Sequence, residues 1–419
     1  MSVSIPPARP GQDGQDGGAA APPAPVGWFG MDPFDPAWRD DPYPALNRLR
    51  EAAPVHETPD GYFRIMRHAD VTHVLKELKV GVRTTDGRLP GVDESTMPRR
   101  FMLMQDPPNH TRLRRLVSRA FTPPAIAAMQ PHVQELVDDL LDAAEARGDG
   151  RIDVIDDLAR PLPSTVICQM LGVPLEDRPK FTDWTAHITH LLAPRRMSDE
   201  TRRRAGEAAT GLVTYMSALI EERRKQLGDD MLSVLIRAEA DGDKLSHEEL
   251  ITQSVGLLVA GFETTIGLVG NGMRQLMLHP EQLQKLRDDP ALIDGAVEEC
   301  LRFDGPIAAT RRVLHEDAVI GGFMVPKDRE VMLSIAASHR DPALYDRPDE
   351  FDITRDHKSH LAFGGGIHFC LGAHLARMET RTAIGKLVAR FPKLELEQQQ
   401  PIWGESLFRI QQTLPVQVA

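Results

Sequence analysis

Apolar residues recur at helical spacing over most of the chain between residues 109 and 303, which predicts a mainly helical protein. In Ile126–Arg147 the apolar side chains share one face, and Gly148 follows the last turn. The same pattern predicts helices over Pro42–Glu51, Arg160–Leu171, Arg178–Leu192, Glu200–Leu227 and residues 281–303.

The longest apolar segment is Leu250–Leu278. Ser246-His-Glu-Glu249 precedes it as a capping-box sequence, and Pro280 ends it. About 30 helical residues at roughly 1.5 Å each span on the order of 45 Å, the width of a domain. We therefore expect a long central helix.

Two segments have β character instead. Val55–Arg67 predicts a hairpin around Pro59-Asp60-Gly61, and Arg312–Ile335 predicts short strands that turn at Gly321-Gly322. The stretches 79–100 and 341–363 are irregular, and neither a repeat nor a linker is apparent. The pattern favours one mainly α domain over residues 28–419 with a small β-sheet subdomain (α+β), after a disordered Pro/Gly-rich tail over residues 1–27.

Composition narrows the functional classes. The 419 residues carry a net charge of −12, which argues against nucleic-acid binding. The sequence contains no run of about 18 apolar residues, so we expect no membrane span. The protein is expected to be a cytoplasmic monomer. The three cysteines, Cys168, Cys300 and Cys370, are too few and too scattered for a disulfide framework.

One cysteine has distinctive neighbours. Phe363 to Gly372 reads F-G-G-G-I-H-F-C-L-G, and a helix is predicted to follow. The glycines allow the backbone to lie flat against a large ligand, and the helix N-terminus favours a thiolate at Cys370. The stretch alone fits an axial iron ligand, a catalytic thiol or a plain glycine turn. A zinc site with His368 and His374 would need matched ligands elsewhere, and none is apparent.

The middle of the long helix contains Ala260-Gly-Phe-Glu-Thr-Thr265, which includes poor helix formers and a carboxyl group among apolar residues. It fits either a small-residue packing face with one paired glutamate, or a locally opened helix that offers a hydroxyl and a carboxyl for proton delivery.

Two further motifs are ambiguous by themselves. Glu299 and Arg302 share the i, i+3 spacing of Glu200/Arg203 and Glu221/Arg224, which are expected to be surface pairs. Residues 106–115, D-P-P-N-H-T-R-L-R-R, place cations at a helix start, where they are unfavourable unless compensated. They fit either a solvated basic face, or a site for a bound anionic group with a docking patch for an acidic partner.

Together these motifs resemble the cytochrome P450 superfamily, in its soluble bacterial class, from about Trp28 onward. The haem signature F-x-x-G-x-H-x-C-x-G is matched at Phe363, Gly366, His368, Cys370 and Gly372. The oxygen-activation motif is matched at Ala260, Gly261, Glu263, Thr264 and Thr265, and the E-x-x-R pair at Glu299 and Arg302. Small departures are Glu263 for a commoner Asp, Asp328 for a turn glycine and His339 for a common Asn.

The resemblance implies haem b (iron protoporphyrin IX) with Cys370 as the metal ligand and O2 as co-substrate. It implies that His110, Arg114, Arg312 and His368 bind the haem propionates, and that Thr264 and Glu263 deliver protons. The implied reaction is hydroxylation or epoxidation of a hydrophobic small molecule, such as a terpenoid, steroid, fatty acid or polyketide. The expected pocket residues are Leu258, Ile307, Ala308, Ala309 and Leu407, within segments 79–104, 258–264, 306–310 and 406–408.

No flavin or iron–sulfur motif is present, so electrons are expected from a separate ferredoxin and ferredoxin reductase. Docking is expected near Arg112, Arg115 and Arg377. One alternative is a peroxide-driven peroxygenase, which resembles this class but has Arg-Pro in place of Glu263-Thr264. Another is a haem-binding sensor, which would usually need an output domain.

Overall fold

The structure is a computed structural model that describes residues 36–59, 61–90, 101–192, 198–240, 245–356, 359–404, 406 and 408–418. The expected tail over residues 1–27, the pocket residue Leu407 and residues 91–100 of the irregular stretch 79–100 lie outside these residues. The α-helices are α1 Pro36–Asp40, α2 Tyr43–Ala52, α3 His68–Lys76, α4 Asn109–Val117, α5 Pro123–Glu145, α6 Pro161–Met170, α7 Arg178–Ile188, α8 Asp199–Lys225, α9 Met231–Ala240, α10 His247–Leu278, α11 Pro280–Asp288, α12 Ile293–Asp304, α13 Ile335–Ser338 and α14 Ala373–Arg390.

The strands form small sheets, as the sequence predicts for the β subdomain. The five-stranded sheet has the order β1-β2-β8-β5-β3, and β1 and β2 form the expected antiparallel hairpin. The other sheets are β4-β12-β9 and the pairs β6-β7 and β10-β11. The strands are β1 Val55–Glu57, β2 Phe63–Ile65, β3 Val80–Gly81, β4 Arg151–Asp153, β5 Ala309–Leu314, β6 Ala318–Ile320, β7 Phe323–Val325, β8 Glu330–Ser334, β9 Leu394–Leu396, β10 Ile402–Trp403, β11 Gln411–Thr413 and β12 Pro415–Val418.

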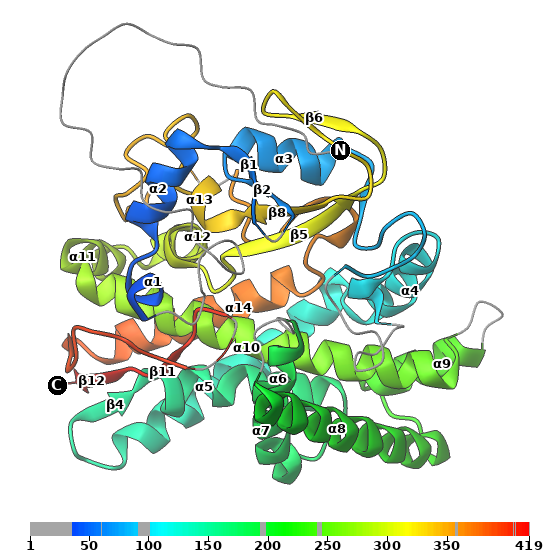
Figure 1. Cartoon of the computed structure of the whole chain (residues 1–419). Coiled ribbons are helices and arrows are strands. Elements are labelled where there is room, and N and C mark those ends of the chain that lie inside the picture. Colours follow the sequence, from blue (N-terminus) through cyan, green and yellow to red (C-terminus); the bar gives the residue numbers. More distant parts are fainter. Residues whose placement is uncertain are drawn as a thin grey trace, which may run out of the picture.

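Helix α10 is the central element (Figure 1). The five-stranded sheet lies on one side of it in this view, and α5 to α8 lie on the other. Its N-terminus has the predicted capping box: the Ser246 hydroxyl accepts from the Glu249 N–H at 3.1 Å, and the Glu249 carboxylate accepts from the Ser246 N–H at 2.8 Å. The capping box thereby satisfies two backbone N–H groups and sets the residue at which the helix begins, and so the register of the side chains along it.

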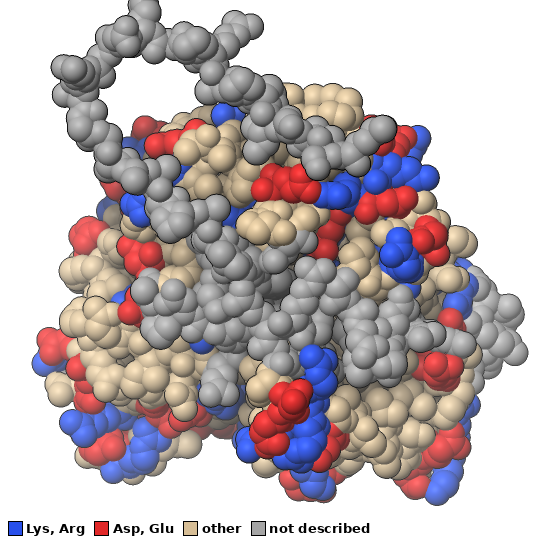
Figure 2. All heavy atoms as spheres, viewed as in Figure 1, with Lys and Arg blue, Asp and Glu red and all other residues tan. Residues whose placement is uncertain are grey.

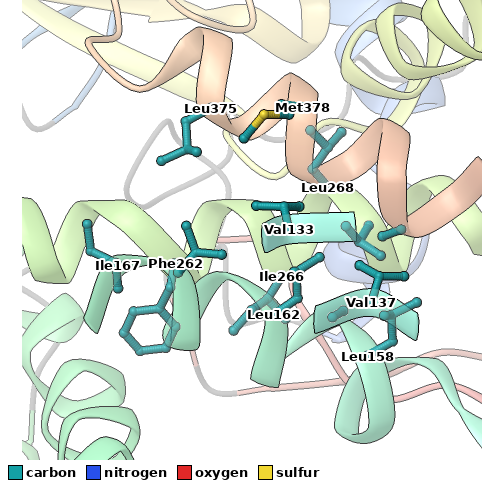
Figure 3. Packing of buried hydrophobic residues seen from close by; sticks show 14 of the residues in the cluster. Val133, Val137, Leu158, Leu162, Ile167, Phe262, Ile266, Leu268, Leu375 and Met378 are labelled. Carbon is teal, nitrogen blue, oxygen red and sulfur yellow. The ribbon is translucent and has the colours of Figure 1, made fainter. Parts of the chain in front are cut away.

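The main core forms around α10. Phe262 and Ile266 point toward α6, and Leu268 lies on the side of α14, where Leu375 and Met378 project (Figure 3). Each such side chain contributes about 1.5–3 kcal/mol when fully buried. Among the described helices, α10 alone is long and apolar enough to cross a membrane, and 78% of its apolar 18-residue stretch is buried inside the protein. It is therefore packed as a core helix.

Several elements differ from the sequence prediction. Helices α3 and α9, strand β4, the π-helical turn Val154–Ala159 and the strands β9 to β12 were not predicted. Residues 281–303, expected as one helix, form the separate helices α11 and α12. Val80 and Gly81 pair with β5, although the stretch around them was expected to be irregular. Such two- and three-residue strands carry too little alternation for a sequence pattern to detect, because their pairing depends on distant strands.

Candidate active site

The loop from Phe363 to Gly372 closes on itself, because the Cys370 N–H donates to the Phe363 carbonyl at 2.9 Å. Gly364 and Gly366 have φ angles of 71° and 67°, which favour glycine. A Cβ on Gly366 would collide with the carbonyl oxygen of Leu75 in α3. Gly366 is thus needed for this close packing on α3, and the flat approach to a ligand that the sequence suggested stays a prediction.

Cys370 lies just before α14, and its side chain is exposed. Although its surface is accessible, the protein groups on its other sides desolvate the thiol and raise its pKa, while a backbone hydrogen bond from Gly372 and the nearby Arg114 and Arg377 act in the opposite direction. The sequence predicts that the helix N-terminus favours the thiolate, and desolvation of the free thiol acts in the opposite direction. Coordination to a metal ion deprotonates a thiol, so Cys370 fits a metal ligand better than a free thiolate.

A group of cationic and imidazole side chains gathers beside this loop. The rings of His110 and His368 lie 4.3 Å apart, and Arg114 donates to the Phe369 carbonyl at 2.6 Å. The Arg312 guanidinium is 5% exposed, and burial lowers its pKa to about 10. Arg312 donates to the Arg311 carbonyl at 2.7 Å and to the Thr310 hydroxyl at 3.3 Å.

This group is incompletely satisfied among the described residues. His110 Nδ1 and His368 Nε2 are buried and have no hydrogen-bond partner. Burial, followed by Arg312, His110 and Arg114, lowers the pKa of His368 to about 3, so its imidazole is neutral at pH 7 and can donate one N–H. Two orphaned imidazole nitrogens and two guanidinium groups beside a cysteine fit a metal complex that carries carboxylates. The residues therefore fit haem.

The α10 motif is helical without a break, so the expected local opening of the helix is not observed. Gly261 has a packing role, because a Cβ there would lie 3.1 Å from two carbons of Ile167 in α6. Ala260 is exposed and Thr264 half-exposed, so they form one open stripe of the helix. The Thr264 hydroxyl donates back to the Ala260 carbonyl at 3.4 Å.

Glu263 does not share that stripe. Its side chain is 5% exposed, and its Oε2 accepts a hydrogen bond from the Ser406 hydroxyl at 3.0 Å. Burial raises its pKa to about 7, while Ser406, Thr189 and Arg160 act in the opposite direction. Glu263 is thus a buried acid that titrates near neutrality, the property expected of a proton donor and acceptor.

The Glu299–Arg302 pair is completely buried, with both side chains 0% exposed. Arg302 Nε donates to Glu299 Oε2 at 2.7 Å and Nη2 to Oε1 at 2.8 Å. Arg302 also donates to the carbonyls of His339, Pro348 and Glu350, and Glu299 accepts from the Asp352 N–H. These backbone hydrogen bonds connect α12 to the irregular segment before the cysteine loop. The pair has a structural role, unlike the exposed Glu200–Arg203 pair of the same spacing.

The expected pocket residues fall into three groups. Ile307, Ala308 and Ala309 are half-buried at the start of β5, as lining residues would be. Leu258 is 0% exposed in the main core, so its assignment to the pocket is wrong. Two residues along a helix turn the side chain by about 200°, which points Leu258 away from Ala260. Leu407 lies outside the described residues.

The three docking arginines have different surroundings. Arg112 forms an ion pair with Glu249 and is 29% exposed, and Arg377 pairs with Glu298 at 2.5 Å and stacks on Phe363. Arg115 is exposed. On the face shown in Figure 2, Lys and Arg are interspersed with Asp and Glu. Of the three, Arg115 has the most exposed side chain.

The sequence did not point to the partners of Glu263. Ser406 is 143 residues away along the chain and lies in a loop that has no periodic pattern. The same holds for Glu298, which accepts from Arg377 and contacts His360 Nε2 at 2.6 Å. Only the three-dimensional fold brings these side chains together.

Comparison with known proteins shows which family this chain is similar to. The family model described as Cytochrome P450 matches residues 58–413. "Cytochrome P450 monooxygenase PikC" from Streptomyces venezuelae is 42% identical over 85% of this chain and 85% of its own. "Vitamin D(3) 25-hydroxylase" from Pseudonocardia autotrophica is 40% identical over 87% of this chain and 90% of its own. The solved structure of P450BioI with an acyl carrier protein ligated to hexadec-9Z-enoic acid has a TM-score of 0.85 and 36% identity, and covers 91% of this chain and 100% of its own.

Proposed function

Because this chain belongs to the cytochrome P450 superfamily and is a haem-dependent monooxygenase, we propose that it hydroxylates or epoxidises a hydrophobic small molecule with electrons from a separate ferredoxin. The observation that carries the proposal is the group of His110, His368, Arg114 and Arg312 beside Cys370, in which two buried imidazole nitrogens have no described partner. Bound haem supplies the activation of O2 and the oxidising power.

In this proposal Cys370 ligates the iron, and His110, Arg114, Arg312 and His368 bind the propionates. Charge-assisted hydrogen bonds from guanidinium groups to carboxylates would offset the cost of burying Arg312. Phe363, Gly366 and Gly372 in the cysteine loop, and Ala260 and Gly261 in α10, would line the haem faces.

Thr264 and Glu263 would divide proton delivery between them. Thr264 presents its hydroxyl on the open stripe of α10, where its weak 3.4 Å bond to the Ala260 carbonyl would leave the hydroxyl free to donate a hydrogen bond into the site. Glu263 has a pKa of about 7 and accepts the Ser406 hydroxyl at Oε2, so both of its protonation states are populated at neutral pH.

Replacing Thr264 with Ala tests this division. The variant should keep haem and substrate, but divert electrons into hydrogen peroxide, and product formed per electron pair should fall by about tenfold or more because a positioned proton donor is lost. Product and peroxide are measured together against NADPH consumed. Thr264→Ser, which keeps the hydroxyl, serves as the control. Fully coupled turnover in Thr264→Ala would remove this role.

The names of relatives narrow the substrate class. They include a vitamin D(3) 25-hydroxylase and a 6-deoxyerythronolide B hydroxylase. Together with the half-buried apolar residues Ile307 to Ala309 and the fatty-acyl complex of P450BioI, they support a polyketide, steroid, terpenoid or fatty-acid substrate rather than a small polar one. Spectral titration of the holoenzyme with macrolactones, sterols, terpenes and fatty acids tests this class. A spin-state shift with none of these four groups would contradict it.

We further propose that the ferredoxin docks around Arg115, on the side of the cysteine loop. Arg115→Glu should slow reduction by a [2Fe–2S] ferredoxin about tenfold at low salt, and less at high salt, because screening weakens the attraction. Stopped-flow reduction measures this rate. Arg204→Glu on α8, which is also exposed, is the matched control. Equal rates for both variants would place the docking surface elsewhere.

A further inference from the structure

Glu263 is held by groups outside its own helix. The Ser406 hydroxyl, in the loop between β10 and β11, donates to its Oε2 at 3.0 Å. The same Ser406 oxygen accepts the Phe408 N–H at 3.2 Å. Because that acceptance occupies one side of the oxygen, it directs the hydroxyl proton toward the carboxylate.

A second hydroxyl contributes less. Thr189, which follows α7 and is 1% exposed, also hydrogen-bonds Glu263, but its single proton is shared with the Ala186 carbonyl at 3.1 Å. Arg160 is the charged group that acts on Glu263, through space. Ser406 is therefore the principal donor to this acid among the described residues.

The loop that carries Ser406 is itself fastened to the start of the described chain. Arg39 in α1 donates to the Ser406 carbonyl at 2.6 Å and to the carbonyls of Gly404 and Phe408. Arg409 returns a bond to the Arg39 carbonyl and pairs with the buried Asp304 at 3.0 Å. One guanidinium thus holds three carbonyl groups, which limits the positions that the Ser406 hydroxyl can reach.

We propose that Ser406 is a positioning residue for proton delivery: its hydroxyl orients the Glu263 carboxyl and favours its ionised form, and Arg39 fixes Ser406 in place. The inference rests on the proposed role of Glu263. A hydrogen bond to the charged form of an acid lowers its pKa, and burial alone would leave Glu263 protonated to a higher pH. The hydrogen bond from Ser406 thus lowers the pKa of Glu263 toward 7, where the carboxyl can both release and take up a proton.

The test compares pH profiles of substrate-coupled turnover in the holoenzyme. Ser406→Ala should raise the pH midpoint of the limb that reports Glu263 by on the order of one unit, because the carboxylate loses a hydrogen bond. The spectrum of the carbonyl complex should not change. Ser406→Thr keeps a hydroxyl and should restore the original profile. Infrared titration of the buried carboxyl band, identified by its loss in Glu263→Gln, should show the same shift without turnover.

The outcomes separate the two claims. If Glu263→Gln leaves the wild-type pH profile intact, Glu263 is not the acid, and the proposed proton route fails. If Glu263→Gln removes the limb but Ser406→Ala leaves both the limb and the infrared midpoint in place, the role of Ser406 is overturned while that of Glu263 stands. A loss of turnover at every pH, with no shift in either midpoint, would mean that Ser406 is only structural.

Discussion

Replacing Cys370 with Ser should abolish the thiolate signature of the reduced carbonyl complex and reduce monooxygenation to background. A serine hydroxyl is a much poorer ligand for iron than a thiolate and cannot push the same electron density toward bound oxygen. The loop should survive, because the Cys370 N–H bond to Phe363 is a backbone interaction and the side chain is exposed. Absorbance spectra of the reduced, carbonyl-treated protein measure the signature.

Cys168→Ser is the matched control for this variant. Cys168 is 1% exposed in α6, and a hydroxyl there can bond to the carbonyl four residues earlier. This control should keep the thiolate signature and turnover. Persistence of the signature in Cys370→Ser, or its loss in Cys168→Ser alone, would overturn the assignment of Cys370 as the iron ligand.

The second large effect concerns stability. Glu299→Ala should lower the free energy of unfolding by about 3–5 kcal/mol, because it leaves the fully buried Arg302 guanidinium without its carboxylate. The Asp352 N–H would also lose its acceptor. Denaturant unfolding, followed by circular dichroism and by haem absorbance, measures the change.

The chain supplies a control with the same spacing. Glu200→Ala removes the carboxylate of the exposed Glu200–Arg203 pair, in which both side chains are more than half exposed, and should leave the unfolding midpoint nearly unchanged. Equal midpoint shifts for the two variants would mean that burial does not distinguish the pairs. No shift for Glu299→Ala would contradict the structural role of Glu299.

The sequence predicted the parts that follow from local periodicity and spacing. The boundaries of α10 and its capping box are confirmed, because both depend on neighbouring residues. The turn at Gly321-Gly322 is confirmed as well, with both φ angles positive. Asp328, which stands in for a turn glycine, has a φ of 60°, so it adopts the conformation that the turn requires.

The remaining features required the fold. Spacing alone could not separate Glu299–Arg302 from Glu200–Arg203, since only burial distinguishes them. Motif matching also did not show that Glu263 and Thr264 face different surroundings, although adjacent helix residues point about 100° apart. The raised pKa of Cys370 is likewise a matter of desolvation, which depends on everything packed around the loop.

The hold of Arg39 on the loop around Ser406 has a practical consequence for protein engineering. Shortening the chain up to Pro36 would leave this guanidinium in place, whereas a cut beyond Arg39 would release three carbonyl groups at the opposite end of the sequence. A truncation series across this point should therefore show a step in activity rather than a gradual decline. Arg39 in α1 thus holds the loop between β10 and β11 in position.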